Sequence, residues 1–128
     1  MHPGRIYEGF VPGRHLIDSY GAGGFRFAEM SHRGSILALS SGVKAWEVTS
    51  PAEFSVAAFT PVFAEADEID VLLIGTGGDP APLPEELRWR FRDARIGVDA
   101  MQTGAAARTY NILMAENRKV AAALVAVS

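Results

Sequence analysis

The chain has 128 residues, no cysteine, and 12 lysines and arginines against 15 aspartates and glutamates, which leaves a net charge of -3. A chain of this length suits a single domain over residues 1–128 with a hydrophobic core of its own. The lack of cysteine excludes disulfides, zinc–thiolate sites and a cysteine nucleophile. The acidic balance argues against non-specific nucleic-acid binding.

The first third of the chain predicts short antiparallel strands. Glycine-rich turns divide the segment between Ile6 and Val48. These turns fall at Pro12-Gly13, Gly21–Gly24, Arg33-Gly34-Ser35 and Ser41-Gly42. Apolar residues alternate with polar ones between the turns, as in Phe25-Arg26-Phe27. This pattern is typical of an antiparallel meander.

A short helical region follows at Ser50. Ser50-Pro51-Ala52-Glu53 matches a capping box, and Ser55 is the alternative cap. Pro61 interrupts the apolar stretch that follows, so the helix there is short, kinked or restarted at Thr60.

Strands and helices alternate from Asp70 onward. The apolar patterns predict strands over 70–74, 96–101 and 120–127, and helices over 84–94 and 104–118, with Thr103 placed to cap the second helix. Strand–helix–strand units pair in parallel. We therefore predict an α/β domain with a mixed sheet, in which antiparallel N-terminal strands join parallel C-terminal strand–helix units and helices pack on the sheet.

The glycine-rich loop after the first of these strands is one candidate site. Backbone N–H groups in Gly75-Thr76-Gly77-Gly78 could bind an anion at the carboxyl end of the strand. However, three prolines follow in place of a third glycine that would open a helix, and no Walker lysine is present. A tight turn that leaves a buried strand is therefore the alternative interpretation.

The second candidate is the helix that Thr103 opens. Arg108 could bind a carboxylate or phosphate in a bidentate manner, and Asn111 is a mediocre helix former whose position favours a hydrogen-bonding role. In the alternative interpretation Arg108 pairs with an acidic loop, Tyr110 fills core space and Asn111 binds a neighbouring backbone. Because both candidates follow the carboxyl ends of strands, a crevice between them is the predicted pocket for a small anionic ligand.

No catalytic residue, cofactor or metal is assigned. His2, His15 and His32 lack the spacing of metal ligands, and we predict that they are surface residues. Met1–Arg5 leads into no apolar segment, and the longest apolar run is too short to span a membrane. A cytoplasmic location is expected.

Charge is distributed unevenly along the chain. No lysine or arginine occurs between Lys44 and Arg88, whereas nine acidic residues do. An arginine cluster follows, with Trp89 among its members Arg88, Arg90, Arg92 and Arg95. The candidate partner surface consists of Arg88, Trp89, Arg92 and Arg95. Arginine and tryptophan are enriched at interface hot spots, so we predict a partner surface here, with a solvated helix face as the alternative.

The order and spacing of several short motifs resemble a known family. These landmarks are Gly24-Phe25-Arg26, Gly34-Ser35-Ile36-Leu37, Trp46, Ile74-Gly75-Thr76-Gly77, Leu83-Pro84, Thr109-Tyr110-Asn111, Glu116-Asn117-Arg118 and Ala122-Ala123-Leu124. The family is that of mitochondrial complex I (NADH:ubiquinone oxidoreductase) assembly factor 3 and its uncharacterised bacterial and archaeal relatives. The chain departs from it at Ser40, Ala107 and Asn117, where many relatives have proline, cysteine and glycine.

The resemblance implies a compact mixed-sheet domain without an established catalytic activity, whose mitochondrial branch binds partners during complex I assembly. We therefore expect a non-enzymatic binding or assembly module. Its partner would be a protein, such as a membrane-complex subunit or another assembly factor. The alternative is a small-molecule binding protein or enzyme that uses the crevice at Gly75–Gly78 and Thr103–Arg108.

Overall fold

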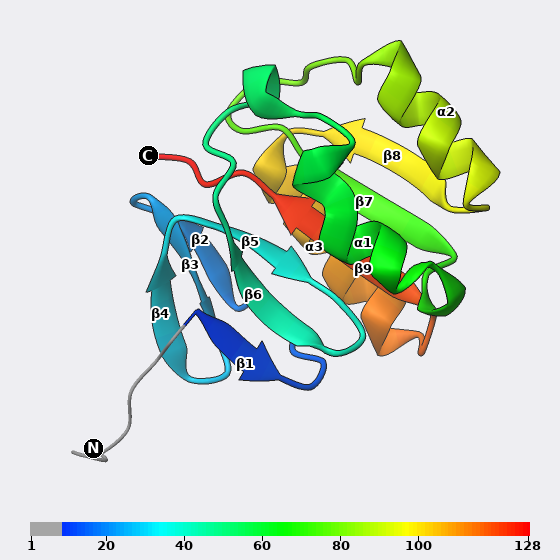
Figure 1. Cartoon of the computed structure of the whole chain (residues 1–128). Coiled ribbons are helices and arrows are strands. Elements are labelled where there is room, and N and C mark those ends of the chain that lie inside the picture. The colour runs from blue at the N-terminus through cyan, green and yellow to red at the C-terminus, as the bar shows by residue number, and fades with distance from the viewer. Residues whose placement is uncertain (1–8) are drawn as a thin grey trace.

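The computed structural model describes residues 9–128. The predictions for Met1–Arg5 and for His2, and the start of the predicted meander at Ile6, lie outside these residues. Within the described range, a central sheet has its strands in the order β1-β6-β5-β9-β7-β8, and a smaller sheet has the order β2-β3-β4 (Figure 1).

The strands divide into an antiparallel and a parallel group. The N-terminal strands are β1 (Phe10–Pro12), β2 (Ser19–Gly21), β3 (Gly24–Phe27), β4 (Met30–Arg33), β5 (Ser35–Ala38) and β6 (Gly42–Trp46). The later strands are β7 (Val71–Gly75), β8 (Gly97–Met101) and β9 (Val120–Leu124). β7 pairs in parallel with both β8 and β9, whereas β5 pairs with β9 and β6 in antiparallel fashion. The prediction of a mixed sheet is confirmed.

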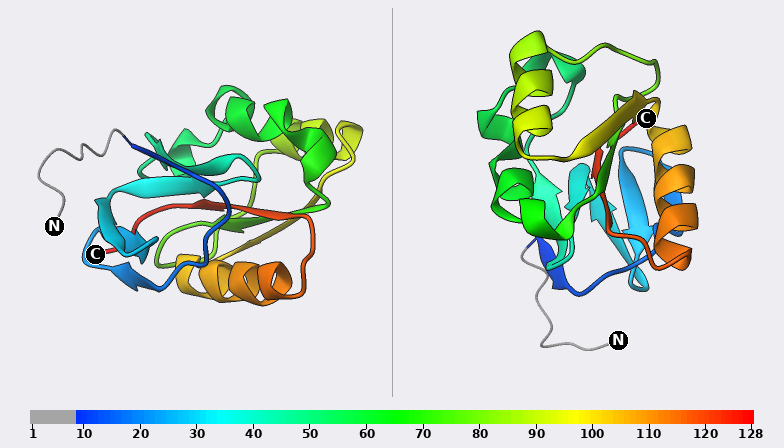
Figure 2. Two further views of the ribbon diagram at one scale, coloured as in Figure 1. Left: turned by 90° about the horizontal axis from the view of Figure 1, so that it is seen from below. Right: turned by 90° about the vertical axis from the view of Figure 1, so that its right-hand side faces the viewer.

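Helices cover both faces of the central sheet. α1 (Thr60–Ala64) and α2 (Glu85–Asp93) lie on one face, and α3 (Thr103–Ala115) lies on the other, next to the small sheet (Figure 2). Short 3-10 helices connect β6, α1 and β7, and they span Pro51–Glu53, Ala57–Phe59 and Ala66–Glu68. The helix restarts at Thr60, which is one of the alternatives that Pro61 predicts.

Each face of the central sheet has its own hydrophobic core. On the α1 and α2 side, the ring of Phe59 packs edge-on against Trp46 and Phe91, with centroid distances of 5.2 Å and 5.3 Å. On the other side, Ala106 and Ala107 of α3 are buried against the sheet. Their small side chains let this helix lie close to the strands. β9 is buried along its whole length because it lies between these two cores.

The helix caps differ from the predicted ones. The Glu53 carboxylate accepts a hydrogen bond from the backbone N–H of Thr49 at 2.6 Å, and Ser50 makes no side-chain cap. This hydrogen bond is the main reason that the pKa of Glu53 lies below its ordinary value. The Ser55 hydroxyl accepts from the N–H of Ala58 at 3.2 Å, but Val56 is the N-cap of this 3-10 helix, so Ser55 is not the cap either.

α3 begins and ends at other residues than predicted. Gln102 is the N-cap of α3, and Thr103 is its first residue, so the prediction that Thr103 caps the helix is wrong. The helix ends at Ala115 because Asn117 has a φ of 63°, and the Arg118 N–H then donates to the Leu113 carbonyl at 3.1 Å. This arrangement is a Schellman motif, in which asparagine replaces the usual glycine.

The two hairpins of the small sheet both turn through left-handed residues. Ala22 and Gly23 connect β2 to β3 with φ values of 53° and 83°, and Ala28 and Glu29 connect β3 to β4 with φ values of 53° and 61°. Positive φ at both central positions is the geometry of a type I′ turn, which favours asparagine and glycine. Glu29 is therefore a poor residue for its position.

We predict that Glu29→Gly stabilises the protein. Glycine adopts positive φ without the steric cost of a Cβ atom, so the free energy of unfolding should rise by about 1 kcal/mol. A urea titration measures this change. Ala52→Gly is the control, because this exposed residue lies outside the left-handed region and its replacement should cost about 0.5–1 kcal/mol. Equal losses in both variants would contradict the turn assignment.

Candidate functional site

The carboxyl ends of β7 and β9 meet the first turn of α3 through Thr103. This residue is 0% exposed. Its hydroxyl donates to the Val125 carbonyl at 2.6 Å and accepts from the Gly77 N–H at 2.9 Å. The Thr103 N–H donates in turn to the Gly77 carbonyl at 2.9 Å. One buried side chain therefore connects the glycine-rich loop, α3 and the segment after β9.

Gly75 makes this close approach possible. A Cβ atom on Gly75 would lie 2.9 Å from both the Cα atom and the hydroxyl oxygen of Thr103. The neighbouring Thr76 hydroxyl lies 2.6 Å from the Asp79 carbonyl oxygen and 3.1 Å from that of Met101. The polar groups of Thr76, Gly77 and Thr103 thus make hydrogen bonds within the chain.

The predicted crevice residues divide into two groups. A cavity of about 580 Å³ borders the loop, and Gly77 and Gly78 line it together with residues 49–51 and 125–128. Arg108 lies exposed farther along α3. Gly75–Gly78 and Thr103 therefore lie together at the end of the sheet. Arg108 lies apart from them and does not line this cavity.

Tyr110 and Asn111 both contact the segment that precedes β2. Asn111 binds the backbone of Ile17 twice, since its carbonyl oxygen accepts from the N–H at 2.9 Å and its amide donates to the carbonyl at 2.8 Å. Tyr110 is buried in the core, with its hydroxyl 3.4 Å from the His15 carbonyl oxygen. Burial raises the pKa of Tyr110 to about 12, and the charge of Arg14 partly opposes this shift. Both contacts match the alternative interpretation of these residues.

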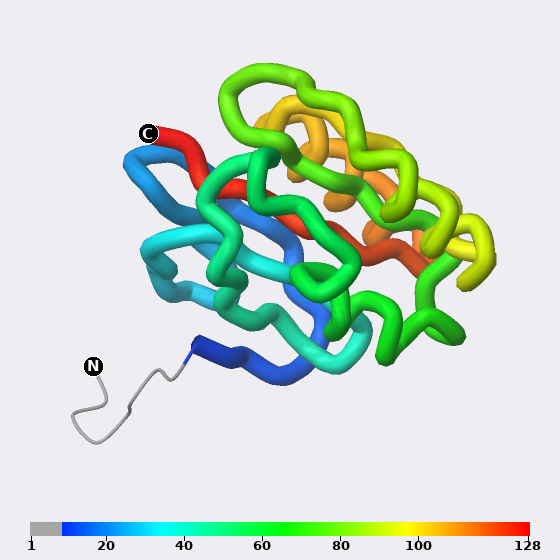
Figure 3. The backbone as a smooth tube through the Cα atoms, turned by 45° about the horizontal axis from the view of Figure 1, so that its top comes forward, coloured from blue at the N-terminus to red at the C-terminus, as the bar shows by residue number. Residues whose placement is uncertain are grey.

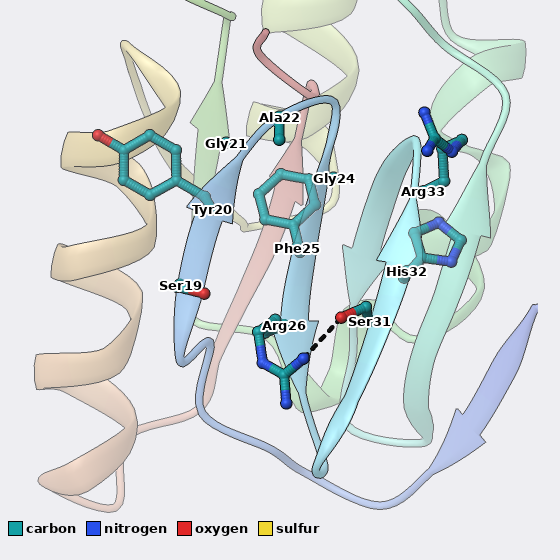
Figure 4. Close-up of a pocket in the computed structure, with 10 residues that line it drawn as sticks. All are labelled: Ser19, Tyr20, Gly21, Ala22, Gly24, Phe25, Arg26, Ser31, His32 and Arg33. Carbon is teal, nitrogen blue, oxygen red and sulfur yellow. Dashed lines mark hydrogen bonds between the residues drawn. The ribbon is translucent and has the colours of Figure 1, made fainter.

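The outer face of the small sheet carries a polar groove that the sequence analysis missed. Its volume is about 610 Å³, and Figure 4 shows its lining residues. Strand alternation places Ser19, Arg26, Ser31 and Arg33 on this face, because Ser19 pairs with Arg26, Arg26 with Ser31 and Gly24 with Arg33. The Arg26 guanidinium donates to the Ser31 hydroxyl at 2.7 Å. The alternation in Phe25-Arg26-Phe27 was the signal for this face.

The same alternation turns His32 inward. The residue is 7% exposed, and its Nε2 atom lies 3.2 Å from the Ser35 carbonyl oxygen. Its ring also lies 6.3 Å from that of Phe27. The prediction of a surface histidine is therefore wrong for His32, because the pairing of β3 with β4 decides which side chains face the core.

The arginine cluster lies on and just after α2. Leu87 and Phe91 bury one side of this helix, which leaves Trp89 53% exposed on another. The Arg92 guanidinium stacks over the Trp89 ring at 4.8 Å from its centroid. Arg88 and Arg92 both border a groove of about 460 Å³ between α2, β8 and residues 81–83.

Arg95 occupies the left-handed position that ends α2. Its φ is 61°, and its N–H donates to the Arg92 carbonyl at 3.0 Å. The Ile96 N–H reaches back to the Phe91 carbonyl at 3.0 Å, which completes a Schellman motif. Arg88, Trp89, Arg92 and Arg95 are all exposed, and we call these four residues the α2 arginine surface.

Comparison with known proteins identifies relatives of the chain. A family model described as "Protein of unknown function (DUF498/DUF598)" matches residues 17–125. An uncharacterized protein of Rhodobacter capsulatus is 38% identical over 84% of this chain and 82% of its own length. NADH dehydrogenase [ubiquinone] 1 alpha subcomplex assembly factor 3 of Danio rerio is 30% identical over 86% of this chain, which spans only 63% of that protein.

A solved structure has the same fold. The crystal structure of a protein of Bartonella henselae, described as an outer membrane protein, superposes with a TM-score of 0.88. The two sequences are 53% identical, and the match covers 91% of this chain and 98% of the other. The fold of this chain is therefore similar to that of the Bartonella henselae protein.

We predict that Thr103→Val destabilises the protein by about 1–3 kcal/mol, because the Gly77 N–H and the Val125 carbonyl would lose their buried partner. Valine keeps the shape of the side chain, so the loss reports the hydroxyl. Urea unfolding measures it. Thr109→Val is the matched control, since within residues 9–128 the Thr109 hydroxyl makes only a 3.9 Å contact with the Met101 sulfur. Similar losses in both variants would argue against the role of Thr103.

The raised pKa of Tyr110 predicts a loss of stability at high pH. Above the ordinary value of 10.0 the phenol ionises in the unfolded chain, while the folded chain keeps its proton up to about 12. The free energy of unfolding should therefore fall as the pH rises through this interval. Tyr110→Phe removes this contribution and also the phenolate absorbance step near pH 12. A Tyr110→Phe variant with the wild-type pH dependence would contradict the assignment.

Proposed function

The chain belongs to the DUF498/DUF598 family, and we propose that it is a non-enzymatic module that binds a protein partner during the assembly of a larger complex. The relatives named assembly factor 3 support this proposal. The chain spans only 63% of the Danio rerio protein, so the role of that protein does not pass directly to this chain. We therefore include a role in the assembly of respiratory complex I in the proposal itself.

The observation that carries the proposal is the α2 arginine surface. Trp89 is a large exposed side chain, and Arg92 is held over its ring, so two residue types that dominate protein interfaces lie preassembled on one helix. Arg88 adds a further cation beside a groove of mixed polar and apolar lining. Such a surface suits a partner with an acidic, partly apolar docking site.

The proposed partner is a membrane-complex subunit or a second assembly factor, reached from the cytoplasm. Among residues 9–128, no helix is long and apolar enough to cross a membrane. The module would therefore contact such a complex through its surface.

Binding or conversion of a small anionic molecule at Gly75–Gly78 and Thr103–Arg108 is the alternative. This alternative has less support, because Thr76, Gly77 and Thr103 use their polar groups for hydrogen bonds within the chain. A thermal-shift screen with nucleotides, phosphates and carboxylates separates the two functions. Stabilisation that grows with ligand concentration would support the alternative.

We predict that the double variant Arg88→Glu, Arg92→Glu captures at least about tenfold less of its partner from a lysate of the organism of origin, because it replaces attraction by like-charge repulsion. Quantitative mass spectrometry of the captured proteins measures the change. Arg108→Glu with Arg118→Glu is the matched control, since it changes the net charge equally at one position on α3 and one just after it, and should capture as the wild type does. Unchanged capture by both variants would overturn the assignment of this surface.

A further inference from the structure

The two edge strands of the central sheet expose different backbone groups. Among the described residues, β8 pairs only with β7, and β1 pairs only with β6. An edge strand offers unpaired N–H and C=O groups to any chain that can pair with it, and proteins commonly protect such edges. The protection of each edge therefore indicates which one is available to a partner.

The hydrogen bonds between β7 and β8 show which groups of β8 point outward. The Gly97 N–H donates to the Asp70 carbonyl at 2.9 Å, and the Met101 carbonyl accepts from the Thr76 N–H at 2.8 Å. Successive residues of a strand direct their backbone groups to opposite sides. Val98 and Ala100 therefore direct their N–H and C=O groups away from β7, toward the open side.

The opposite edge is protected. The Gly9 carbonyl accepts from the Ala45 N–H at 2.7 Å, and the Gly13 N–H donates to the Ser41 carbonyl at 3.0 Å. These bonds leave Phe10 and Pro12 facing outward, and proline has no N–H to donate. β8, with the sequence GVDAM, contains neither proline nor lysine.

The open edge of β8 borders the groove beside α2. Val98 and Ala100, the two residues with outward backbone groups, also line this groove. Leu83, Phe91 and Ile96 contribute further apolar lining, and Arg88 and Arg92 add two cationic side chains. Outward main-chain groups, a groove of mixed polar and apolar lining and two guanidinium groups thus occur at one place.

We propose that β8 binds an extended acidic segment of a partner protein as an additional strand. Main-chain hydrogen bonds to Val98 and Ala100 would hold the segment, and alternate side chains would face the groove. The segment would place an apolar side chain in the groove and, two residues away, a carboxylate against Arg88 or Arg92. This inference rests on the proposed function and specifies how the partner is recognised.

Charge favours such a segment over a second copy of the chain. If two β8 strands paired antiparallel about their centres, Asp99 of one copy would lie opposite Asp99 of the other, and directly opposed like charges are unfavourable. A partner that supplies carboxylates to Arg88 and Arg92 meets the opposite charge instead.

The test uses the full chain and a short probe peptide. Its first, third and fifth residues are valine, glutamate and valine, and threonines lie between them. Backbone NMR should show slower amide hydrogen exchange at Val98 and Ala100 when the probe is added. A peptide with lysine in place of glutamate should bind at least about tenfold more weakly, because it faces Arg88 and Arg92 with a like charge. No change in exchange at Val98 and Ala100, or equal binding of both peptides, would overturn the proposal.

Two substitutions test the main-chain hydrogen bonds. Ala100→Pro removes an outward N–H at a position where edge strands tolerate proline, and should weaken probe binding at least about tenfold. Should this variant unfold, N-methylated probes give the same test without changing the protein. Methylation of one alternate set of peptide amides should abolish binding, and methylation of the other set should leave it intact. Equal effects of the two sets would overturn strand addition.

Partner capture distinguishes failure of this inference from failure of the proposed function. If Arg88→Glu with Arg92→Glu loses the partner while folded Ala100→Pro retains it, the proposed function holds and the additional strand is wrong. If folded Ala100→Pro loses the partner while Arg88→Glu with Arg92→Glu retains it, the arginine surface is wrong and the additional strand at β8 stands. If neither variant loses the partner, both assignments are overturned. A dimer in sedimentation that Ala100→Pro abolishes would identify a second copy as the occupant and overturn the proposal.

Discussion

The hydroxyl of Thr103 holds together the end of the sheet on which the rest of the fold depends. It binds the loop after β7 and the segment after β9, and it does so from the first residue of α3. Replacing a fully buried hydroxyl that has both a donor and an acceptor partner is destabilising, because two buried backbone groups then have neither the hydroxyl nor water as a hydrogen-bond partner. The approach requires Gly75, whose missing side chain lets the helix start rest on the strand.

This junction also joins the antiparallel half of the molecule to the parallel half. Beyond Val125, the Ala126 N–H donates to the Ser35 hydroxyl at 2.9 Å, and the Val127 carbonyl accepts from the Gly23 N–H at 2.7 Å. Figure 3 shows the last residues running beside the turn between β2 and β3. The carboxyl end of the sheet, where open α/β domains often bind ligands, is thus occupied by hydrogen bonds of the chain to itself.

The exposed features that suit recognition lie at another side of the sheet. α2 and β8 follow one another in the chain and share the core around Phe91 and Ile96, so the arginines of one and the open backbone of the other are presented together. The net charge of -3 conceals this arrangement, because an acidic stretch precedes the arginine cluster in sequence. Local charge, rather than the total, therefore decides what the surface can bind.

The sequence by itself determined the elements whose signals are local. The apolar run before Gly75 predicts β7, and the spacing of Leu87 and Phe91 predicts the buried side of α2, because burial repeats with the period of each element. Only the tertiary structure decided that β9 lies between β5 and β7, that His32 faces inward, and that Thr103 bonds across the fold instead of capping its helix. These outcomes depend on which distant segment supplies a hydrogen-bond partner, and no local pattern in the sequence encodes that choice.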